Sequence, residues 1–428
     1  MPGCWTDARN ATSRVAGLSM APALLDGDQI RWEPSGSNLL PARLSRVVCQ
    51  PPHEGVAVKR LIGFGGERVC CRSGELSIDG ARVKKSPHQL AELATAVCGD
   101  PADWQPQSQW WQQIGDCWKS AGVPADQTAW LRFIPGGREG RPGGHGVFYD
   151  DSPWLEAERR RLEVVRDVGL AAVFEVKSLP GSTSEVVLQV GHQTARVGLR
   201  GGGRLACVAG LLDGRFVVAA WPLRGGADGV PLPADKLLGA GRQLFPVGLP
   251  DRWQQAVPIP EAAQPMPIQI GVRTLTETAG FTISRLLIWR DVQWLPHGVQ
   301  ACWEVPPGDV FLLGDCPAAS RDSRQWGSLP AAAVIGRVVA AAEASASGAK
   351  PVGFVQHSQG VGLTDEPVDG IRAVGMADVE AFDRLFIEPG EKHQSAVAEG
   401  PSKQQGLQGL SHNRRVVRVG CIACEGEQ

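Results

Sequence analysis

The segment VAVKRLIGF, residues 56–64, is a run of mainly apolar residues typical of a β-strand, and it decides how the first part of the chain is expected to fold. Successive side chains of a β-strand point to opposite faces, so Lys59 falls on the same face as Ala57 and Leu61. Burial among apolar neighbours can bring the pKa of a lysine from about 10.4 down to roughly 5–7. The segment therefore predicts a strand that carries a desolvated amine, which can act as a general base near neutral pH.

A serine that could use this base lies in GLSMAPALLDGD, residues 17–28. A serine hydroxyl is a poor nucleophile unless a neighbouring base removes its proton. The chain has eight histidines, but none stands in a motif typical of a catalytic triad, so Lys59 is the nearest plausible base for Ser19. Taken alone, Ser19 would be read as a turn residue and Lys59 as a solvated strand residue, and a third segment favours the catalytic interpretation.

That third segment is PPGDVFLLGDCPAASRDSRQWGSLPAAAVIGRVV, residues 306–339. Together with the serine segment, with VKRLIGFGGERV (58–69) and with GELSIDGARV (74–83), it resembles the conserved boxes of type I signal peptidases, in the same order. In GELSIDGARV the Asp79-Gly80 pair predicts the tight turn of a β-hairpin.

The resemblance implies a β-rich catalytic fold that cleaves signal peptides from exported precursor proteins with a serine–lysine dyad. Ser19 matches the nucleophile of the family, and Lys59 matches its general base. The supporting positions that the resemblance implies are Ser320, which would orient the lysine, Asp322 and Arg324, which would brace the site as a pair, and Asp315, which opens the last box. Met20 and Leu61 are candidates for the wall of a shallow apolar pocket that accepts small side chains, and no cofactor is expected.

The chain also departs from the family pattern. Gly17 stands where some members place a hydroxyl that helps to hold the oxyanion, which leaves the backbone N–H of Ser19 as the obvious donor. Family members are usually anchored by an N-terminal membrane helix, but no apolar run here reaches the roughly 18–20 residues that a span needs. The expected location is membrane-associated with an extracytoplasmic site. The open alternatives are a start upstream, another route to the membrane, or a soluble protein.

Domain boundaries follow from changes in composition. Residues 1–88 and 295–342 are expected to form a discontinuous peptidase domain, and residues 89–294 an inserted domain. The insert opens with a tryptophan-rich part near 90–135 that is expected to be helical or irregular. The candidate strands that follow predict an antiparallel β-sandwich, loosely similar to lectin-like jelly rolls. Residues 343–428 are expected to be mostly disordered, with one short helix near ADVEAFDRLF.

Charge and cysteine content argue against two classes of function. A net charge of −2, without a basic cluster among aromatic residues, argues against a nucleic-acid partner. The eleven cysteines cannot all pair within one chain, and the isolated Cys421-x-x-Cys424 is a weak metal signal, so no metal is expected. Two rival functions stay open: a self-cleaving serine–lysine peptidase, and a non-catalytic protein whose insert binds a carbohydrate or a protein.

Overall fold

The computed structural model describes residues 11–342, with gaps, and the strand Phe386–Pro389. The gaps are residues 36–39, 53–54, 121, 126, 135–146, 151–154, 157–162, 180, 224–243, 247, 261–262, 276–278 and 297. The described residues form a mainly β fold with several antiparallel sheets, as the sequence predicted. Of the tail predicted to be disordered, 343–428, the structure describes only Phe386–Pro389 (β27), which form a strand that was not predicted. The rest of the tail, with all but the last residue of the helix predicted at 377–386, lies outside the described residues.

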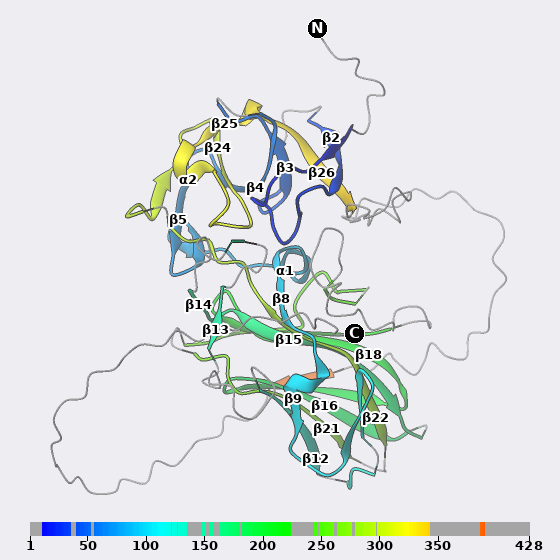
Figure 1. The fold of residues 1–428 in the computed structure, drawn as a ribbon. Coiled ribbons are helices and arrows are strands. Elements are labelled where there is room, and N and C mark those ends of the chain that lie inside the picture. Colours follow the sequence, from blue (N-terminus) through cyan, green and yellow to red (C-terminus); the bar gives the residue numbers. More distant parts are fainter. Residues whose placement is uncertain are drawn as a thin grey trace, which may run out of the picture.

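A seven-stranded sheet contains the strand that the opening segment predicts (Figure 1). In spatial order its strands are β1 (Ala11–Arg14), β2 (Gln29–Pro34), β26 (Val334–Ala342), β3 (Arg46–Cys49), β4 (Ala57–Phe64), β24 (Asp309–Leu313) and β25 (Leu329–Pro330). β4 pairs antiparallel with β3 and with β24. Because it has a neighbour on each side, its backbone is held in place along its length.

A four-stranded sheet packs beside it, in the order β23 (Cys302–Glu304), β5 (Arg68–Arg72), β6 (Glu75–Ile78) and β7 (Ala81–Arg82). The predicted hairpin is confirmed, since Ile78 pairs directly with Ala81. Asp79 and Gly80 have φ of 51° and 80°, which is the backbone that a two-residue primed turn requires.

An eight-stranded sheet and a six-stranded sheet share one hydrophobic core. The eight-stranded sheet contains β8 (Thr95–Cys98), β10 (Trp111–Ile114), β11 (Cys117–Ser120), β15 (Val168–Lys177), β18 (Gly203–Leu212), β19 (Arg215–Pro222), β20 (Gln255–Pro258) and β22 (Gly280–Arg290). The six-stranded sheet contains β9 (Trp104–Pro106), β12 (Thr128–Phe133), β16 (Thr183–Val190), β17 (Gln193–Arg200), β21 (Ile268–Thr274) and β27.

The sequence of β15 shows why the eight-stranded sheet is buried on both faces. Its side chains alternate: Leu170 and Phe174 enter the core shared with the six-stranded sheet, whereas Ala171 and Val173 enter a second apolar cluster. That second cluster includes Leu90 of the helix α1 (Pro87–Leu93). Figure 1 shows α1 between this sheet and the seven- and four-stranded sheets.

The tryptophan-rich part differs from the prediction. Among its described residues only α1 is an α-helix; it begins after the N-cap Ser86 and ends at Leu93. The chain then forms strands β8 to β12, with the short 3-10 turn Pro101–Asp103 between β8 and β9. Trp104 and Trp118 are core residues of the shared core. Aromatic side chains are enriched in half-buried strands. The alternation of aromatic and polar residues in this part therefore indicated strands, and this signal was overlooked.

β14 (Val164–Val165) and β15 are separate strands, with Arg166 and Asp167 between them. β14 pairs with the two-residue strand β13 (Phe148–Tyr149).

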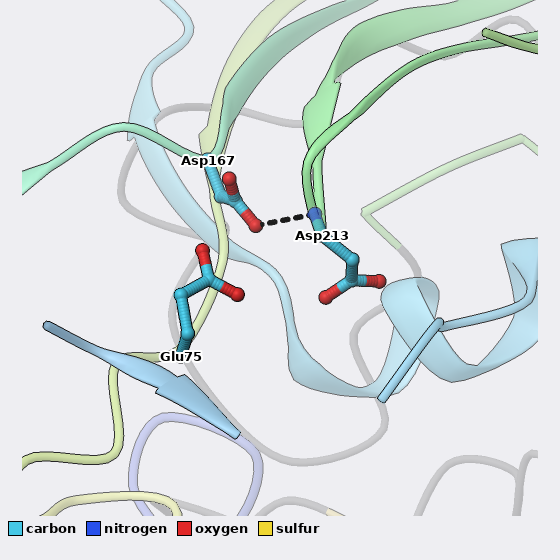
Figure 2. A group of neighbouring side chains, drawn as sticks. All are labelled: Glu75, Asp167 and Asp213. Atoms are coloured by element: carbon cyan, nitrogen blue, oxygen red, sulfur yellow. Dashed lines mark hydrogen bonds between the residues drawn. The ribbon is translucent and has the colours of Figure 1, made fainter. Parts of the chain in front are cut away.

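A charged cluster lies where the four-stranded and eight-stranded sheets meet. Lys85 Nζ lies 2.5 Å from Asp213 Oδ1 and 2.7 Å from Asp291 Oδ2. Asp167 Oδ2 accepts a 2.7 Å hydrogen bond from the backbone N–H of Asp213. Figure 2 shows Glu75 reaching from β6 towards both aspartates.

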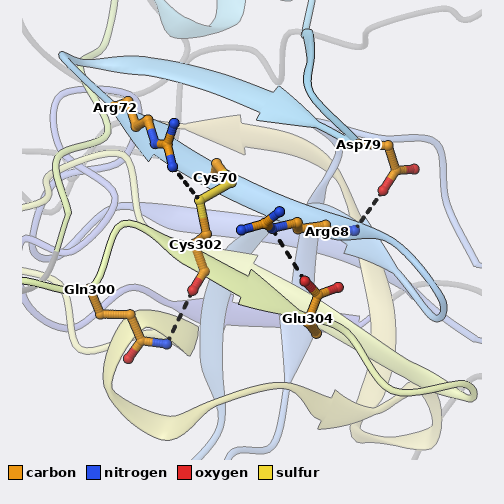
Figure 3. The surroundings of a disulfide bond; sticks show 7 residues. All are labelled: Arg68, Cys70, Arg72, Asp79, Gln300, Cys302 and Glu304. Carbon is orange, nitrogen blue, oxygen red and sulfur yellow. Dashed lines mark hydrogen bonds and ion pairs between the residues drawn. A yellow bond between two sulfur atoms is a disulfide. The ribbon is translucent and has the colours of Figure 1, made fainter.

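One disulfide, Cys70–Cys302, joins β5 to β23 across a sequence separation of 232 residues (Figure 3). This pairing was not predicted from the sequence. Next to it on the same two strands, Arg68 forms an ion pair with Glu304 at 3.2 Å. The bond therefore ties the segment before the two large sheets to the segment after them.

Candidate active site

The loop that carries the predicted nucleophile is held by its own carboxylates. Gly17 N–H donates to Asp26 Oδ1 at 2.7 Å, and Leu25 N–H donates to Asp28 Oδ2 at 2.6 Å. Gly27, between the two aspartates, has a φ of 88°, a conformation that glycine adopts without steric cost. The L-L-D-G-D part of the segment thus fixes the turn that leads into β2.

The structure brings Ser19 and Lys59 together. Lys59 Nζ donates a 2.9 Å hydrogen bond to Ser19 Oγ, and the lysine residue is 4% exposed. The predicted face is confirmed, because Ala57 and Leu61 pack in one apolar cluster with Trp326, whose ring centroid lies 5.8 Å from Lys59 Nζ. A hydroxyl within hydrogen-bonding distance of a buried amine is the arrangement that a nucleophile and its general base need.

Gly314 packs against the backbone of the nucleophile loop. A Cβ atom at this position would collide with the carbonyl oxygen of Ser19 and with Ser320 Oγ. The Ser19 carbonyl also accepts a 3.0 Å hydrogen bond from Cys316 N–H. Ser320 therefore lies beside the dyad, but its buried hydroxyl has no hydrogen-bond partner, so the predicted bond to Lys59 is not formed in this structure.

Arg60, the residue that follows Lys59 on β4, forms a buried ion pair with Asp315. Its Nε and Nη2 donate to the two carboxylate oxygens of Asp315 at 2.7 and 2.9 Å, and its Nη1 donates to Glu92 Oε2 of α1 at 3.0 Å. Burial favours the neutral form of Arg60, but the carboxylates of Asp315 and Glu92 outweigh it and raise the pKa of the guanidinium. This fully buried arginine links β4, β24 and α1.

Asp322 and Arg324 form the predicted pair, with distances of 2.8 Å from Nε to Oδ1 and 2.7 Å from Nη2 to Oδ2. Asp322 also caps the short helix α2 (Ser323–Trp326) and accepts the backbone N–H of Gly314 at 3.0 Å. The guanidinium reaches the carbonyl of Leu295 at 2.9 Å. The pair therefore holds the glycine that packs against the nucleophile loop.

Met20 and Leu61, the predicted pocket residues, are 1% and 0% exposed. Met20 belongs to a cluster with Val15, Leu24 and other residues near β2, whereas Leu61 belongs to the cluster around β3 and β24. The structure does not bring these two side chains together on one wall.

Sequence reasoning missed the parts that Arg60, Glu92 and Gly314 play. A signal was present for the arginine, because a charged residue inside a continuous buried strand is almost never found without a partner. No signal in the sequence identified Glu92, since its contact depends on where α1 packs.

Comparison with known proteins gives a family for part of the chain. Residues 8–129 and 292–342 match the family described as "Signal peptidase, peptidase S26", which confirms the resemblance drawn from the sequence. The two matched stretches are interrupted by residues 130–291, which is consistent with an insertion. The first stretch extends into residues 89–129, which were expected from the sequence to belong to the insert.

Among solved structures, one match is a mutant of the GH43 protein BlXynB from Bacillus licheniformis, with 8% sequence identity and a TM-score of 0.19. The match covers 62% of this chain and 51% of that one, and at this TM-score it carries no argument about the fold. None of the helices in the described part of the chain has the length and apolarity that a bilayer crossing needs.

Proposed function

Because residues 8–129 and 292–342 belong to the signal peptidase family, we propose that this protein is a serine endopeptidase that cleaves signal peptides from exported precursor proteins. The observation that supports it most directly is the 2.9 Å contact between Ser19 Oγ and the buried Lys59 Nζ. The proposal assigns Ser19 as the nucleophile and Lys59, in its neutral form, as the general base.

In the proposed reaction Ser19 Oγ attacks the scissile carbonyl carbon while Lys59 Nζ takes the hydroxyl proton. The tetrahedral intermediate collapses to an acyl-enzyme, and the lysine returns that proton to the leaving amine. Water then hydrolyses the ester and regenerates the hydroxyl. We propose the backbone N–H of Ser19 as an oxyanion donor, a contribution that typically speeds such reactions by roughly 100- to 1000-fold.

We propose supporting roles for the residues around the dyad. Asp322 and Arg324 position Gly314, and Asp315 with Arg60 fixes the strand that carries the lysine. Ser320 orients Lys59 once substrate binding brings the two side chains into contact. Met20 and Leu61 are proposed to contribute to the substrate pocket from two separate apolar clusters rather than from one wall.

The domain division is part of the proposal. The seven- and four-stranded sheets contain only strands from residues 11–82 and 302–342, whereas the eight- and six-stranded sheets are built from residues 95–290 and β27. This supports a peptidase domain formed by residues 1–88 and 295–342, and an inserted β-sandwich at 89–294. The insert is proposed to present a carbohydrate- or protein-binding surface.

We propose that the site works outside the cytoplasm, at a membrane surface. Disulfides persist mainly in oxidising compartments, and the Cys70–Cys302 bond lies in the part of the chain that matches the peptidase family.

The test is cleavage of a purified precursor that carries an Ala-x-Ala site. Ser19→Ala and Lys59→Met should each lower the cleavage rate by at least about 1000-fold, because nucleophile and base act as a unit. Ser35→Ala and Lys84→Met, which change exposed residues, are the matched controls and should cleave normally.

A serine-directed acylating probe, followed by peptide mass mapping, separates the rival functions. Modification of Ser19 in the natural protein, and its loss in Lys59→Met, is the expected result. Undiminished precursor cleavage by either dyad variant would refute the assignment. An unmodified Ser19 together with an uncleaved precursor would favour a non-catalytic binding protein, and cleavage of the chain itself would favour a self-processing peptidase.

A further inference from the structure

We propose that the carboxylates where the four-stranded and eight-stranded sheets meet bind one divalent cation, and that Ca²⁺ is the ion they fit best. Glu75, Asp167 and Asp213 each offer a carboxylate oxygen, and these three oxygens lie within 4.8 Å of one another (Figure 2). This set is named the junction cluster below. The inference goes beyond the proposed peptidase activity and does not depend on it.

Two further oxygens at the junction cluster lack a hydrogen-bond partner. Asp291 is 3% exposed; its Oδ2 contacts Lys85, whereas its Oδ1 has no donor. Gln293 is 8% exposed; its Nε2 donates to the Val164 carbonyl at 3.0 Å, which leaves its Oε1 without a donor. An unsatisfied buried acceptor costs free energy, which a bound cation would recover.

The two residues that carry these oxygens line the same cavity as two of the three carboxylates. Glu75, Asp167, Asp291 and Gln293 line one cavity of about 290 Å³. Asp291 shares the ammonium of Lys85 with Asp213, which places its carboxylate within the cluster. The Glu75 side chain is 27% exposed, so the cavity has an entrance for an ion.

The negative charge of the cluster is incompletely balanced. Lys85 is the buried cation in contact with two of the aspartates, whereas Arg82 and Arg215 reach Glu75 and Asp213 only at 3.5 and 3.6 Å. A divalent cation would add positive charge beside these carboxylates.

The donor set selects a hard cation. All five candidate ligand atoms are oxygens, which suit Ca²⁺ and Mg²⁺ rather than zinc or copper. Two oxygens bound to one Ca²⁺ at 2.3–2.6 Å lie at most about 4.6–5.2 Å apart, so the spacing of these carboxylate oxygens is close to what a shared Ca²⁺ needs and small side-chain shifts would complete it. Mg²⁺ demands a near-ideal octahedron at about 2.0–2.1 Å, which this irregular set matches poorly.

The ligands come from separate segments on both sides of the junction. Glu75 lies on β6 of the four-stranded sheet, Asp167 precedes β15, Asp213 joins β18 to β19, and Asp291 follows β22. A bound ion would therefore tie the two sheets together and stabilise their arrangement.

The experiment uses the full-length protein, treated with EDTA and then dialysed. Titration with CaCl₂ in a calorimeter should give saturable binding with a stoichiometry near one, and the melting temperature should rise with CaCl₂ more than with equal MgCl₂. Glu75→Gln and Asp167→Asn should each weaken Ca²⁺ binding by at least roughly 10- to 100-fold. Asp116→Asn, in an exposed turn between β10 and β11, is the matched control and should bind normally.

Absence of Ca²⁺ binding to the natural protein at millimolar concentration would overturn the proposal and would mean that water alone fills the cavity. Unchanged affinity in both ligand variants would also overturn it, since the ion would then bind elsewhere. If a variant fails to fold, the titration of the natural protein still decides. Ser19→Ala should bind Ca²⁺ as the natural protein does, which separates this proposal from the peptidase assignment.

Discussion

Replacement of Asp322 by alanine gives the sharpest test of how the candidate site is held. The carboxylate is fully buried and accepts hydrogen bonds from Gly314 N, Arg324 N, Arg324 Nε and Arg324 Nη2 at 3.0, 3.2, 2.8 and 2.7 Å. Asp322→Ala leaves the Arg324 guanidinium, 5% exposed, without its counter-ion. Removal of one partner of a buried ion pair costs about 3–5 kcal/mol.

The matched comparison is Glu33→Ala. Glu33 and Arg337 also form an ion pair, at 3.3 Å, but their side chains are 49% and 41% exposed. Such surface pairs contribute about 0–1 kcal/mol. The two variants should therefore differ by at least about 2 kcal/mol, or roughly 30-fold in the unfolding equilibrium constant.

Urea unfolding, followed by tryptophan fluorescence and by far-ultraviolet circular dichroism, measures this difference. Asp322→Ala should also slow acylation of the nucleophile, because Gly314 loses the acceptor of its N–H. Equal stability of the two variants would refute the reasoning, and an unchanged acylation rate in Asp322→Ala would show that the pair does not position the site.

Three other predictions follow from single contacts. Gly314→Ala should slow labelling of the nucleophile by about 100-fold, measured with the serine-directed probe, because its methyl group displaces the backbone of the nucleophile loop; labelling at the natural rate would contradict this. Burial raises the pKa of the Cys71 thiol to about 12, so iodoacetamide at pH 8 should modify the partly exposed Cys117 and spare Cys71, as read by mass spectrometry; equal modification of both would contradict it. Reduction of Cys70–Cys302 should destabilise the protein by about 2–5 kcal/mol, seen as a lower melting temperature with dithiothreitol, and an unchanged melting temperature would count against it.

The sequence predicted the parts of the fold that short-range patterns specify. Alternation in β4 placed Lys59 on the face of Ala57 and Leu61, and Asp79-Gly80 located a hairpin turn. Both depend on neighbours a few residues apart, where the backbone itself sets the geometry.

Contacts between segments that are distant in the sequence could not be predicted from its patterns. Glu92 meets Arg60 only because α1 packs near β4, and the carboxylates of the junction cluster come from segments separated by dozens of residues. Ser320 shows the opposite case. The family resemblance placed it beside the dyad, yet its hydroxyl is unpartnered, because hydrogen bonding depends on side-chain positions that a motif does not specify.

The tryptophan-rich part shows why composition alone misleads. Trp104 and Trp118 were read as helical or irregular, but they fill the shared core from strands. Aromatic residues occur in the cores of both helices and strands, so a high tryptophan content does not specify the secondary structure. Here the packing of these segments against the sheets sets it.

The covalent bond between β5 and β23 has a practical consequence for anyone who purifies the protein. A protease that cuts once anywhere between its two sulfur-bearing residues would produce two polypeptides that still migrate together on a non-reducing gel. Only a reducing gel would then reveal the nick, so preparations should be compared under both conditions before their activity is interpreted.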